Sequence, residues 1–416
     1  MVPAALLAAA GLCQASAAEL SGRIDFPDPR NPPPWIEVHA AALRDFELGR
    51  SLFNSRWLPA GHAEAERRVG LGPLFVEDSC DACHDDGTRG RPPAAPDGLS
   101  NSFVMQLGGA PTAYGLVLQT RAIDGHTPEG RVIKTLRQRV GRYADGQRWT
   151  LQEPRYAVAD PSLGPLPAHV VLKPRIAPAL FGDGLLDAVQ QPAIDFIRAA
   201  QPARLRGRIG GRFGWQGGAI SLVDQTAIAF AREMGLTSEP QPRDDCTPAQ
   251  PACREALQGG MPEMPERFFH ALNTFQFLLA APARAKVEPR IDAAGAALFS
   301  RVGCADCHAP QLPVPRENDS IRIDPYTDLM LHDMGDGLAD RTVAGRVARS
   351  HWRTAPLWGL AFALQAGPIA LLHDGRASSI EEAILWHEGQ GNDARRKFMA
   401  LDAASRRQLL EWIATL

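Results

Sequence analysis

The pentapeptides CDACH at residues 80–84 and CADCH at residues 304–308 share one pattern, C-x-x-C-H, and the chain is organised around these two copies. In this pattern two thiols three residues apart add to the vinyl groups of a haem, and the adjacent histidine ligates the iron. The pattern therefore predicts two covalently bound haem c groups. The residues that would bind them are Cys80, Cys83, His84, Cys304, Cys307 and His308, with the two histidines as proximal iron ligands.

Two other kinds of site also use C-x-x-C. A zinc ribbon has its second cysteine pair about 15–20 residues away, whereas these pairs lie 304 − 80 = 224 positions apart and each carries its own histidine. A thioredoxin-like redox pair lies beside a βαβ pattern, and neither copy has one. We therefore interpret both copies as haem-binding motifs.

Length and charge restrict the class of protein. A chain of 416 residues exceeds what one hydrophobic core usually holds, so two or three domains are expected. Lys and Arg number 44 against 47 for Asp and Glu, which leaves a net charge of −3. This balance does not indicate binding to nucleic acid or to an anionic membrane surface.

The N-terminus is typical of an export signal, although no Lys or Arg precedes its apolar run. Residues 2–13 are uncharged, and Ala15-Ser16-Ala17 supplies the small residues that a signal peptidase cleaves. The run is too short to span a bilayer, and no transmembrane segment is expected. We predict a signal peptide at residues 1–17, a periplasmic protein and a Pro-rich arm at residues 18–40. A lipid anchor at Cys13 is the alternative, but Leu12 occupies the position where such a site has a small residue.

The remaining cysteines, Cys246 and Cys253, flank a loop that contains two prolines. An exported protein can keep such a pair oxidised, so we expect a disulfide, with buried thiols as the alternative. With the disulfide, the mature chain has no cysteine left for thiol chemistry.

An internal repeat surrounds the two motifs. Gly49 and Phe53 lie four residues apart on a predicted helix that begins near residue 41, and Gly295 and Phe299 repeat this spacing before the second motif. The final helix, after the N-cap candidate Asp402, has an apolar stripe and is expected to cross the Gly295 helix closely. We predict an N-terminal haem domain at residues 41–285 and a C-terminal cytochrome c domain at residues 286–416.

The middle region resembles neither repeat. Residues 131–175 contain β-branched and aromatic runs interrupted by Ala144-Asp145-Gly146, which predicts one or two antiparallel hairpins. Helices are expected again at residues 185–199 and 222–234. The predicted fold is mainly α, with two cytochrome c-like domains and a long middle region that contains a small antiparallel β excursion.

Several strings, in this order, resemble the bacterial di-haem oxidoreductase family of peroxidase-like proteins. They are GLGPLF at 70–75, RIAP at 175–178 with GLL at 184–186, GRFGW at 211–215, LHDMG at 331–335 and WRTAPLWG at 352–359. LHDGR at 372–376 with IEEA at 380–383 is also similar to di-haem cytochrome c peroxidases and MauG-like enzymes. The resemblance covers almost all of the mature chain. It implies a periplasmic redox enzyme with two c haems of unequal role.

Candidate residues beside the second haem follow the second motif. Met334 and His332 are the candidate sixth ligands, because a thioether and an imidazole both bind iron and methionine raises the potential. The alternative is a turn that contains a satisfied core histidine. His373 and Arg376 are expected to border a haem, with the guanidinium on a propionate. A locally hydrogen-bonded Asp374-Gly375 turn is the alternative there.

No comparable ligand is evident for the first haem. Met105 lies on an apolar stretch and is expected in the core. Peroxide chemistry needs an open iron and a group that moves a proton, and by analogy with the glutamate of di-haem peroxidases we assign that role to Glu129, a surface carboxylate being the alternative. The MauG resemblance suggests that Trp215 relays electrons between the haems, whereas a core tryptophan is the structural alternative.

Two functions remain open. In the first, an enzyme, the second haem takes electrons from a small redox protein and passes them to the first, which reduces hydrogen peroxide or oxidises a substrate. In the second, a di-haem electron-transfer cytochrome has two six-coordinate irons and no turnover of its own. An accessory protein with structural or sensory haems is a third alternative. The long middle region, for which a carrier has little need, favours the enzyme.

Overall fold

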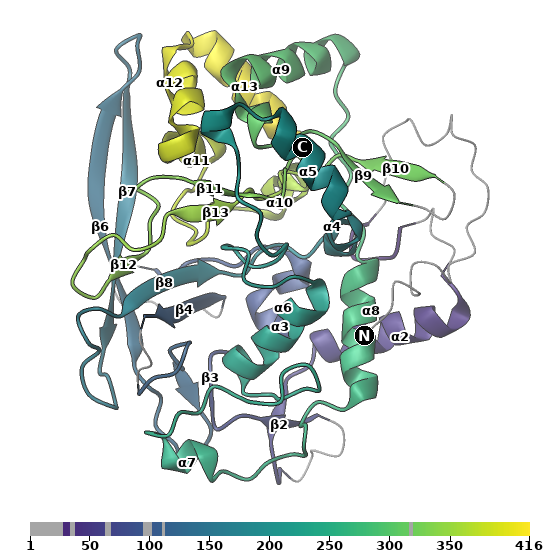
Figure 1. The fold of residues 1–416 in the computed structure, drawn as a ribbon, viewed down its shortest axis with the longest axis vertical. Helices are drawn as coiled ribbons and strands as arrows, with labels where there is room; N and C mark the ends of the chain where they lie inside the picture. Colours follow the sequence, from purple (N-terminus) through teal and green to yellow (C-terminus); the bar gives the residue numbers. More distant parts are fainter. Residues whose placement is uncertain (1–27, 34–37, 63–67, 95–101, 110–112, 316–318) are drawn as a thin grey trace.

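The computed structural model describes residues 28–33, 38–62, 68–94, 102–109, 113–315 and 319–416 (Figure 1). The predicted signal peptide, Cys13 and most of the Pro-rich arm lie outside the described residues. No helix among the described residues is both long enough and apolar enough to cross a membrane.

Two helices cross closely in the N-terminal part. Helix α2 (Ala40–Phe53) packs on α8 (Glu266–Leu278) with Gly49 at the contact, where a Cβ would lie 2.1 Å from the carbonyl oxygen of Ala271. The rings of Phe46 and Phe53 each lie 5.2 Å from the ring of Phe275. Glycine is therefore required at this point, because any side chain would separate the two backbones.

The C-terminal part repeats this crossing. Helix α9 (Pro289–Val302) meets α13 (Ala403–Ile413) at Gly295, where a Cβ would lie 2.1 Å from the indole of Trp412. The side chain of Asp402 accepts a hydrogen bond from the backbone N–H of Ser405 and caps α13. The predicted close crossing and the predicted N-cap are both confirmed. Helices α10 (Leu360–Ala366), α11 (Ile380–Leu385) and α12 (Asn392–Ala400) complete this part.

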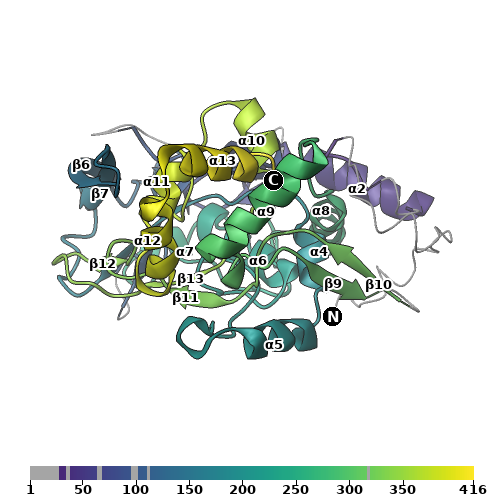
Figure 2. The ribbon, with the colours of Figure 1, turned by 90° about the horizontal axis from the view of Figure 1, so that it is seen from above.

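The predicted hairpin is present and is long. Strands β6 (Arg131–Arg142) and β7 (Arg148–Ala159) pair antiparallel in continuous register. The hairpin extends to the C-terminal helices, where Arg139 binds Glu388 at 2.5 Å and the Tyr143 hydroxyl donates to Glu381 at 2.6 Å. Figure 2 shows it at the opposite end of the molecule from α2. The middle region therefore contacts the C-terminal part of the chain, which carries the second motif, and does not belong to the N-terminal part alone.

A three-stranded sheet joins distant segments in the order β12-β8-β4, formed by Arg341–Thr342, Val171–Ile176 and Phe103–Gly108. Met105 of β4 is buried in the core, as expected. The remaining pairs are two-stranded: β1 (Leu58–Pro59) with β2 (Val69–Leu71), β3 (Leu74–Phe75) with β5 (Arg121–Ala122), β9 (Leu312–Pro315) with β10 (Ser320–Ile323), and β11 (Leu331–Asp333) with β13 (His351–Arg353).

The remaining α-helices and one π-helix lie between α2 and α8 in the sequence. They are α3 (Cys80–Cys83), α4 (Asp183–Ala188), α5 (Gln191–Ala200), α6 (Leu222–Ala229), the π-helix η3 (Phe230–Met234) and α7 (Pro251–Arg254). The two predicted middle-region helices are therefore present, the first broken after Ala188 and the second ending in the π-helix.

The fold class needs a correction. The described residues form 12 α-helices and are about one third helical, with small sheets that are antiparallel except for β1–β2. The fold is therefore mixed rather than mainly α, because short paired strands occur in the segments around both motifs. The division into two cytochrome c-like domains stays a prediction.

Candidate functional site

The two motifs lie in the walls of two cavities. One, here called the N-terminal cavity, has a volume of about 350 Å³ and is lined by Cys80, Cys83 and His84. The other, here called the C-terminal cavity, has a volume of about 200 Å³ and is lined by Cys304, Cys307 and His308. The three chemistry-bearing residues of each motif therefore face one common space.

The first motif is a single helical turn that leaves its histidine pointing inward. The Ser79 hydroxyl accepts a hydrogen bond from the N–H of Ala82 and caps α3. His84 follows, and its Nδ1 lies 2.8 Å from the carbonyl oxygen of Pro178. A carbonyl only accepts, so Nδ1 carries the hydrogen and Nε2 keeps its lone pair. Burial lowers the pKa of His84 to about 4, so the ring is neutral at neutral pH.

The second motif has the same arrangement. Gly303, at φ 101°, ends α9 in a left-handed conformation and turns the chain into the motif. The Nδ1 of His308 lies 3.0 Å from the carbonyl oxygen of Tyr326. Burial, with His387 nearby, lowers the pKa of His308 to about 4. Both motif histidines are thus fixed in the tautomer that leaves Nε2 open to a metal, as metal-ligating histidines usually are.

The thiols of the motif cysteines do not readily lose their protons. Burial raises the pKa of Cys80 and of Cys304 to about 12. It raises the pKa of Cys83 and of Cys307 as well. Redox and zinc sites use thiolates, which positive or polar surroundings favour. These apolar surroundings suit thioether attachment better than either alternative.

Five residues line both cavities, namely Arg89, Trp215, Arg353, Ala355 and Leu360, and three of them have polar side-chain groups: Arg89, Trp215 and Arg353. The indole N–H of Trp215 donates to the carbonyl oxygen of Ile176 at 2.9 Å, which fixes the ring between the cavities. Nη1 of Arg353 is buried and has no partner among the described residues. A buried guanidinium N–H without a hydrogen-bond acceptor is costly, and the propionates of a haem would supply an acceptor. The residues present therefore fit two haem groups, one in each cavity.

The predicted sixth ligands both line the C-terminal cavity, but they differ in availability. His332 is 2% exposed, its Nε2 lies 2.8 Å from a carboxylate oxygen of Asp328, and its Nδ1 lies 3.7 Å from the sulfur of Cys307. Both of its ring nitrogens are therefore engaged. Met334 keeps its thioether near the cavity, with its terminal methyl against Gly391. The satisfied core histidine is the interpretation that suits His332.

The structure separates His373 from Arg376. His373 lines the C-terminal cavity, and its ring stacks on Trp352 at 3.7 Å and 11°. Arg376 lines neither cavity, since Nε and Nη2 bind the carboxylate of Asp374 and Nη1 donates to the carbonyl oxygen of Gly337. The guanidinium of Arg376 therefore stabilises the local turn, which was the alternative for this segment, and its contact with a propionate stays a prediction.

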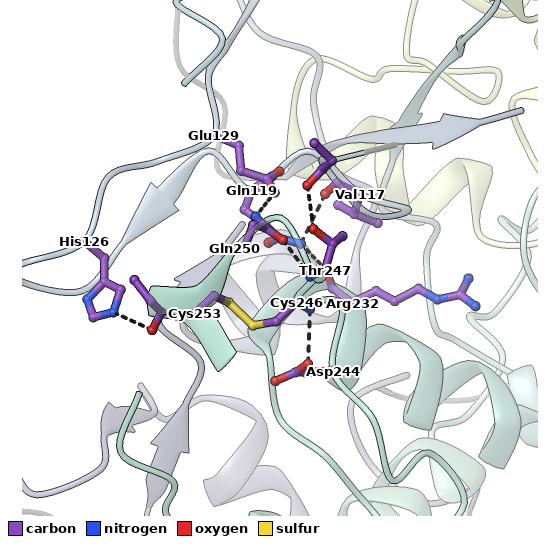
Figure 3. Close-up of a disulfide and its surroundings, with 12 residues drawn as sticks. Val117, Gln119, His126, Glu129, Arg232, Asp244, Cys246, Thr247, Gln250 and Cys253 are labelled. Atoms are coloured by element: carbon purple, nitrogen blue, oxygen red, sulfur yellow. Dashed lines mark hydrogen bonds between the residues drawn. A yellow bond between two sulfur atoms is a disulfide. The ribbon is translucent and has the colours of Figure 1, made fainter. Parts of the chain in front are cut away.

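Glu129 does not lie at the first haem site, where it was predicted. It is 1% exposed and lines neither cavity. One carboxylate oxygen accepts from Gln250 at 2.5 Å and the other from the backbone N–H of Gln119 at 2.7 Å, beside the Cys246–Cys253 disulfide (Figure 3). Burial raises its pKa to about 8. The loop closed by the Cys246–Cys253 disulfide supplies Gln250, so this carboxylate is held behind the cavity wall and is not at the surface either.

Two residues in the cavities were missed by sequence reasoning. His387 lines the C-terminal cavity, its Nδ1 lies 2.7 Å from the carbonyl oxygen of Ala383, and its ring centre lies 6.5 Å from that of His308. Glu233, in the π-helix η3, lines the N-terminal cavity. Burial raises its pKa to about 7. No motif marks either residue, although a lone histidine 79 positions after His308 was a signal available in the sequence.

Comparison with known proteins gives one family. A family model described as "Di-haem oxidoreductase, putative peroxidase" matches residues 195–416. No curated protein matches the chain. Among solved structures, hydrazine synthase of Kuenenia stuttgartiensis, pressurized with xenon, aligns with 97% of this chain and 93% of its own, at 10% identity and a TM-score of 0.37.

Proposed function

Because the chain belongs to the di-haem oxidoreductase family, we propose that it is an exported, peroxidase-like enzyme with two covalent haem c groups of unequal role. The observation that carries this proposal is the arrangement of the two cavities. Each is walled by one C-x-x-C-H motif, and they share Trp215, Arg89 and Arg353. Two redox centres so placed suit electron passage from one to the other.

The C-terminal cavity is the proposed electron-transfer centre. Besides His308 it presents Met334 and His387, either of which can complete the coordination of an iron. Its lining reaches the surface at Arg204, whose side chain is 63% exposed and pairs with Asp393, another lining residue, at 3.2 Å. A small redox protein that docks at this exposed charged edge would supply the electrons.

The N-terminal cavity is the proposed reactive centre. Apart from His84, the only histidine or methionine in its described lining is Met234, which packs in the core at the end of η3. A haem held there by Cys80, Cys83 and His84 would supply the iron that binds hydrogen peroxide and cleaves its O–O bond. Reduction of one peroxide to two water molecules consumes two electrons and two protons. The protein must deliver both to this cavity.

Glu233 is the proposed proton carrier, in place of Glu129. Its carboxyl lines the N-terminal cavity and has no hydrogen bond or ion pair among the described residues, whereas Glu77 in the same cavity binds Arg121 at 2.7 Å. A pKa of about 7 is suited to general acid–base catalysis near neutral pH. The π-helix that presents Glu233 is a form often found at functional sites.

Trp215 is the proposed electron relay. It lines both cavities, and its ring is fixed by the hydrogen bond to Ile176. An indole in this position shortens the distance that an electron must cross between two haems.

The proposal is tested by electron paramagnetic resonance (EPR) of the oxidised holoprotein together with stopped-flow mixing with hydrogen peroxide. We expect one high-spin and one low-spin haem and a rapid change of the Soret band. Glu233→Gln should slow the reaction by roughly 10²–10⁴-fold, and the exposed Glu239→Gln serves as the matched control. Two low-spin haems that do not respond to peroxide would instead support the electron-transfer cytochrome without turnover.

A further inference from the structure

We propose that His387 is the sixth ligand of the haem at the second motif, so that two imidazoles hold its iron. This inference rests on the proposed function only in requiring a haem in the C-terminal cavity. It replaces the expectation that Met334 or His332 completes the coordination.

The geometry of the two rings carries the inference. The ring centres of His308 and His387 lie 6.5 Å apart. A bond from imidazole nitrogen to a first-row metal is about 2.0–2.1 Å, and the nitrogen lies roughly 1.1 Å from its ring centre, so two imidazoles on one metal have centres about 6.3 Å apart. The two histidines therefore stand at the separation that one shared iron requires.

The hydrogen bonds orient both rings for this role. Nδ1 of His308 lies 3.0 Å from the carbonyl oxygen of Tyr326, and Nδ1 of His387 lies 2.7 Å from that of Ala383. Each Nδ1 therefore carries the hydrogen, which leaves the lone pair on Nε2. Neither Nε2 has a hydrogen-bond partner among the described residues, and both side chains line the C-terminal cavity. His387 thus repeats, from the loop after α11, what the motif supplies at His308.

The competing ligands fit less well. His332 has Nε2 on Asp328 and Nδ1 beside Cys307, so neither nitrogen is available. Met334 packs beside His387 rather than in place of it, because its terminal methyl and the His387 ring lie against the same glycine, Gly391. Met334 then shields the imidazole from solvent without binding the iron.

Two imidazoles change what this haem does. A methionine ligand raises the reduction potential of a haem relative to a second histidine. With His387 bound, the C-terminal haem is a stronger reductant and passes electrons more readily toward the N-terminal haem. The inference therefore gives a direction to the electron transfer that Trp215 would mediate.

The experiment uses EPR and visible spectra of the full-length oxidised holoprotein. In His387→Gly we expect the C-terminal haem to change from low-spin to high-spin, with loss of the whole low-spin signal. Added imidazole should restore it, because the deleted side chain leaves room for the free ligand. His387→Met is a second variant that keeps a ligand, and it should stay low-spin, gain the far-red band of methionine ligation and have a raised potential.

Met334→Leu is the matched control, since it keeps the volume and removes the sulfur. We expect its low-spin signal and potential to match those of the parent protein. A low-spin signal that survives in His387→Gly but disappears in Met334→Leu would overturn the inference and assign the ligand to Met334, leaving the proposed peroxidase function intact. Failure of the proposed function has a different result, namely no reaction with peroxide in the parent protein.

Discussion

Glu129 offers a test that separates a structural carboxylate from a catalytic one. Its side chain is buried between Gln250 and the backbone of Gln119, outside both cavities. Burial raises its pKa from an ordinary value of 4.5 to about 8, while the two N–H donors oppose this rise. Glu129→Gln removes the titration and keeps the shape of the side chain.

The sign of the pH effect follows from this raised pKa. The folded protein holds a proton on Glu129 that the unfolded chain releases above about pH 4.5, so the contribution of Glu129 to stability is complete below that pH and is lost as the pH rises through about 8. Each pH unit in this window costs about 1.4 kcal/mol. Between pH 5 and pH 8 the loss has an upper limit of about 4 kcal/mol.

The assay is urea unfolding of the holoprotein at pH 5, 6, 7 and 8 for the parent, for Glu129→Gln and for the exposed control Glu239→Gln. Other buried carboxyls, such as Asp245, also titrate in this range, so the informative quantity is the difference between parent and variant. We expect the parent to lose stability relative to Glu129→Gln as the pH rises, and peroxide reactivity to stay unchanged. A constant difference in stability, combined with a slower reaction with peroxide, would refute the structural role and restore the catalytic one.

Three further predictions concern the frame and the haems. Gly295→Ala places a Cβ 2.1 Å from the Trp412 indole and should lower the free energy of unfolding, measured by urea titration, by about 1–3 kcal/mol. Gly218→Ala, whose Cβ would have nothing within 4 Å, is the control and should change this free energy little. A Gly295→Ala variant more stable than the parent would contradict the close crossing. Replacement of both cysteines of the second motif by alanine should halve the covalent haem on stained denaturing gels, and undiminished staining would exclude attachment there. Trp215→Phe should slow electron transfer between the haems in flash-reduction measurements without changing their spin states, and an unchanged rate would move the path elsewhere.

Local patterns predicted the features that depend on neighbours in the sequence. The helix crossing at Gly295 follows from its spacing to Phe299, and the β6–β7 hairpin follows from β-branched residues around a turn. The helical content was overestimated because strands such as β1 and β12 are only two residues long, which is too short for an alternating pattern to be recognised.

Local sequence patterns could not identify site residues that distant segments bring together. Glu129 is close in sequence to the first motif, but its carboxylate binds Gln250, 121 positions later, outside the N-terminal cavity. His387 follows α11 without any motif, and only the fold brings it opposite His308. The attachment of a cofactor is encoded locally by C-x-x-C-H, whereas the group on the other side of the iron is set by tertiary packing.

The two motifs therefore cannot by themselves distinguish the two haems. His84 and His308 have the same hydrogen bond from Nδ1 to a backbone carbonyl, and burial lowers the pKa of both rings. What differs is the opposite wall: an imidazole at the matching separation in the C-terminal cavity, and in the N-terminal cavity a carboxyl, Glu233, with no partner among the described residues. An iron saturated by two imidazoles can only exchange electrons, while an iron with an open position beside a proton carrier can bind and cleave a small oxidant. The proposed division of labour therefore rests on the segments that face the motifs.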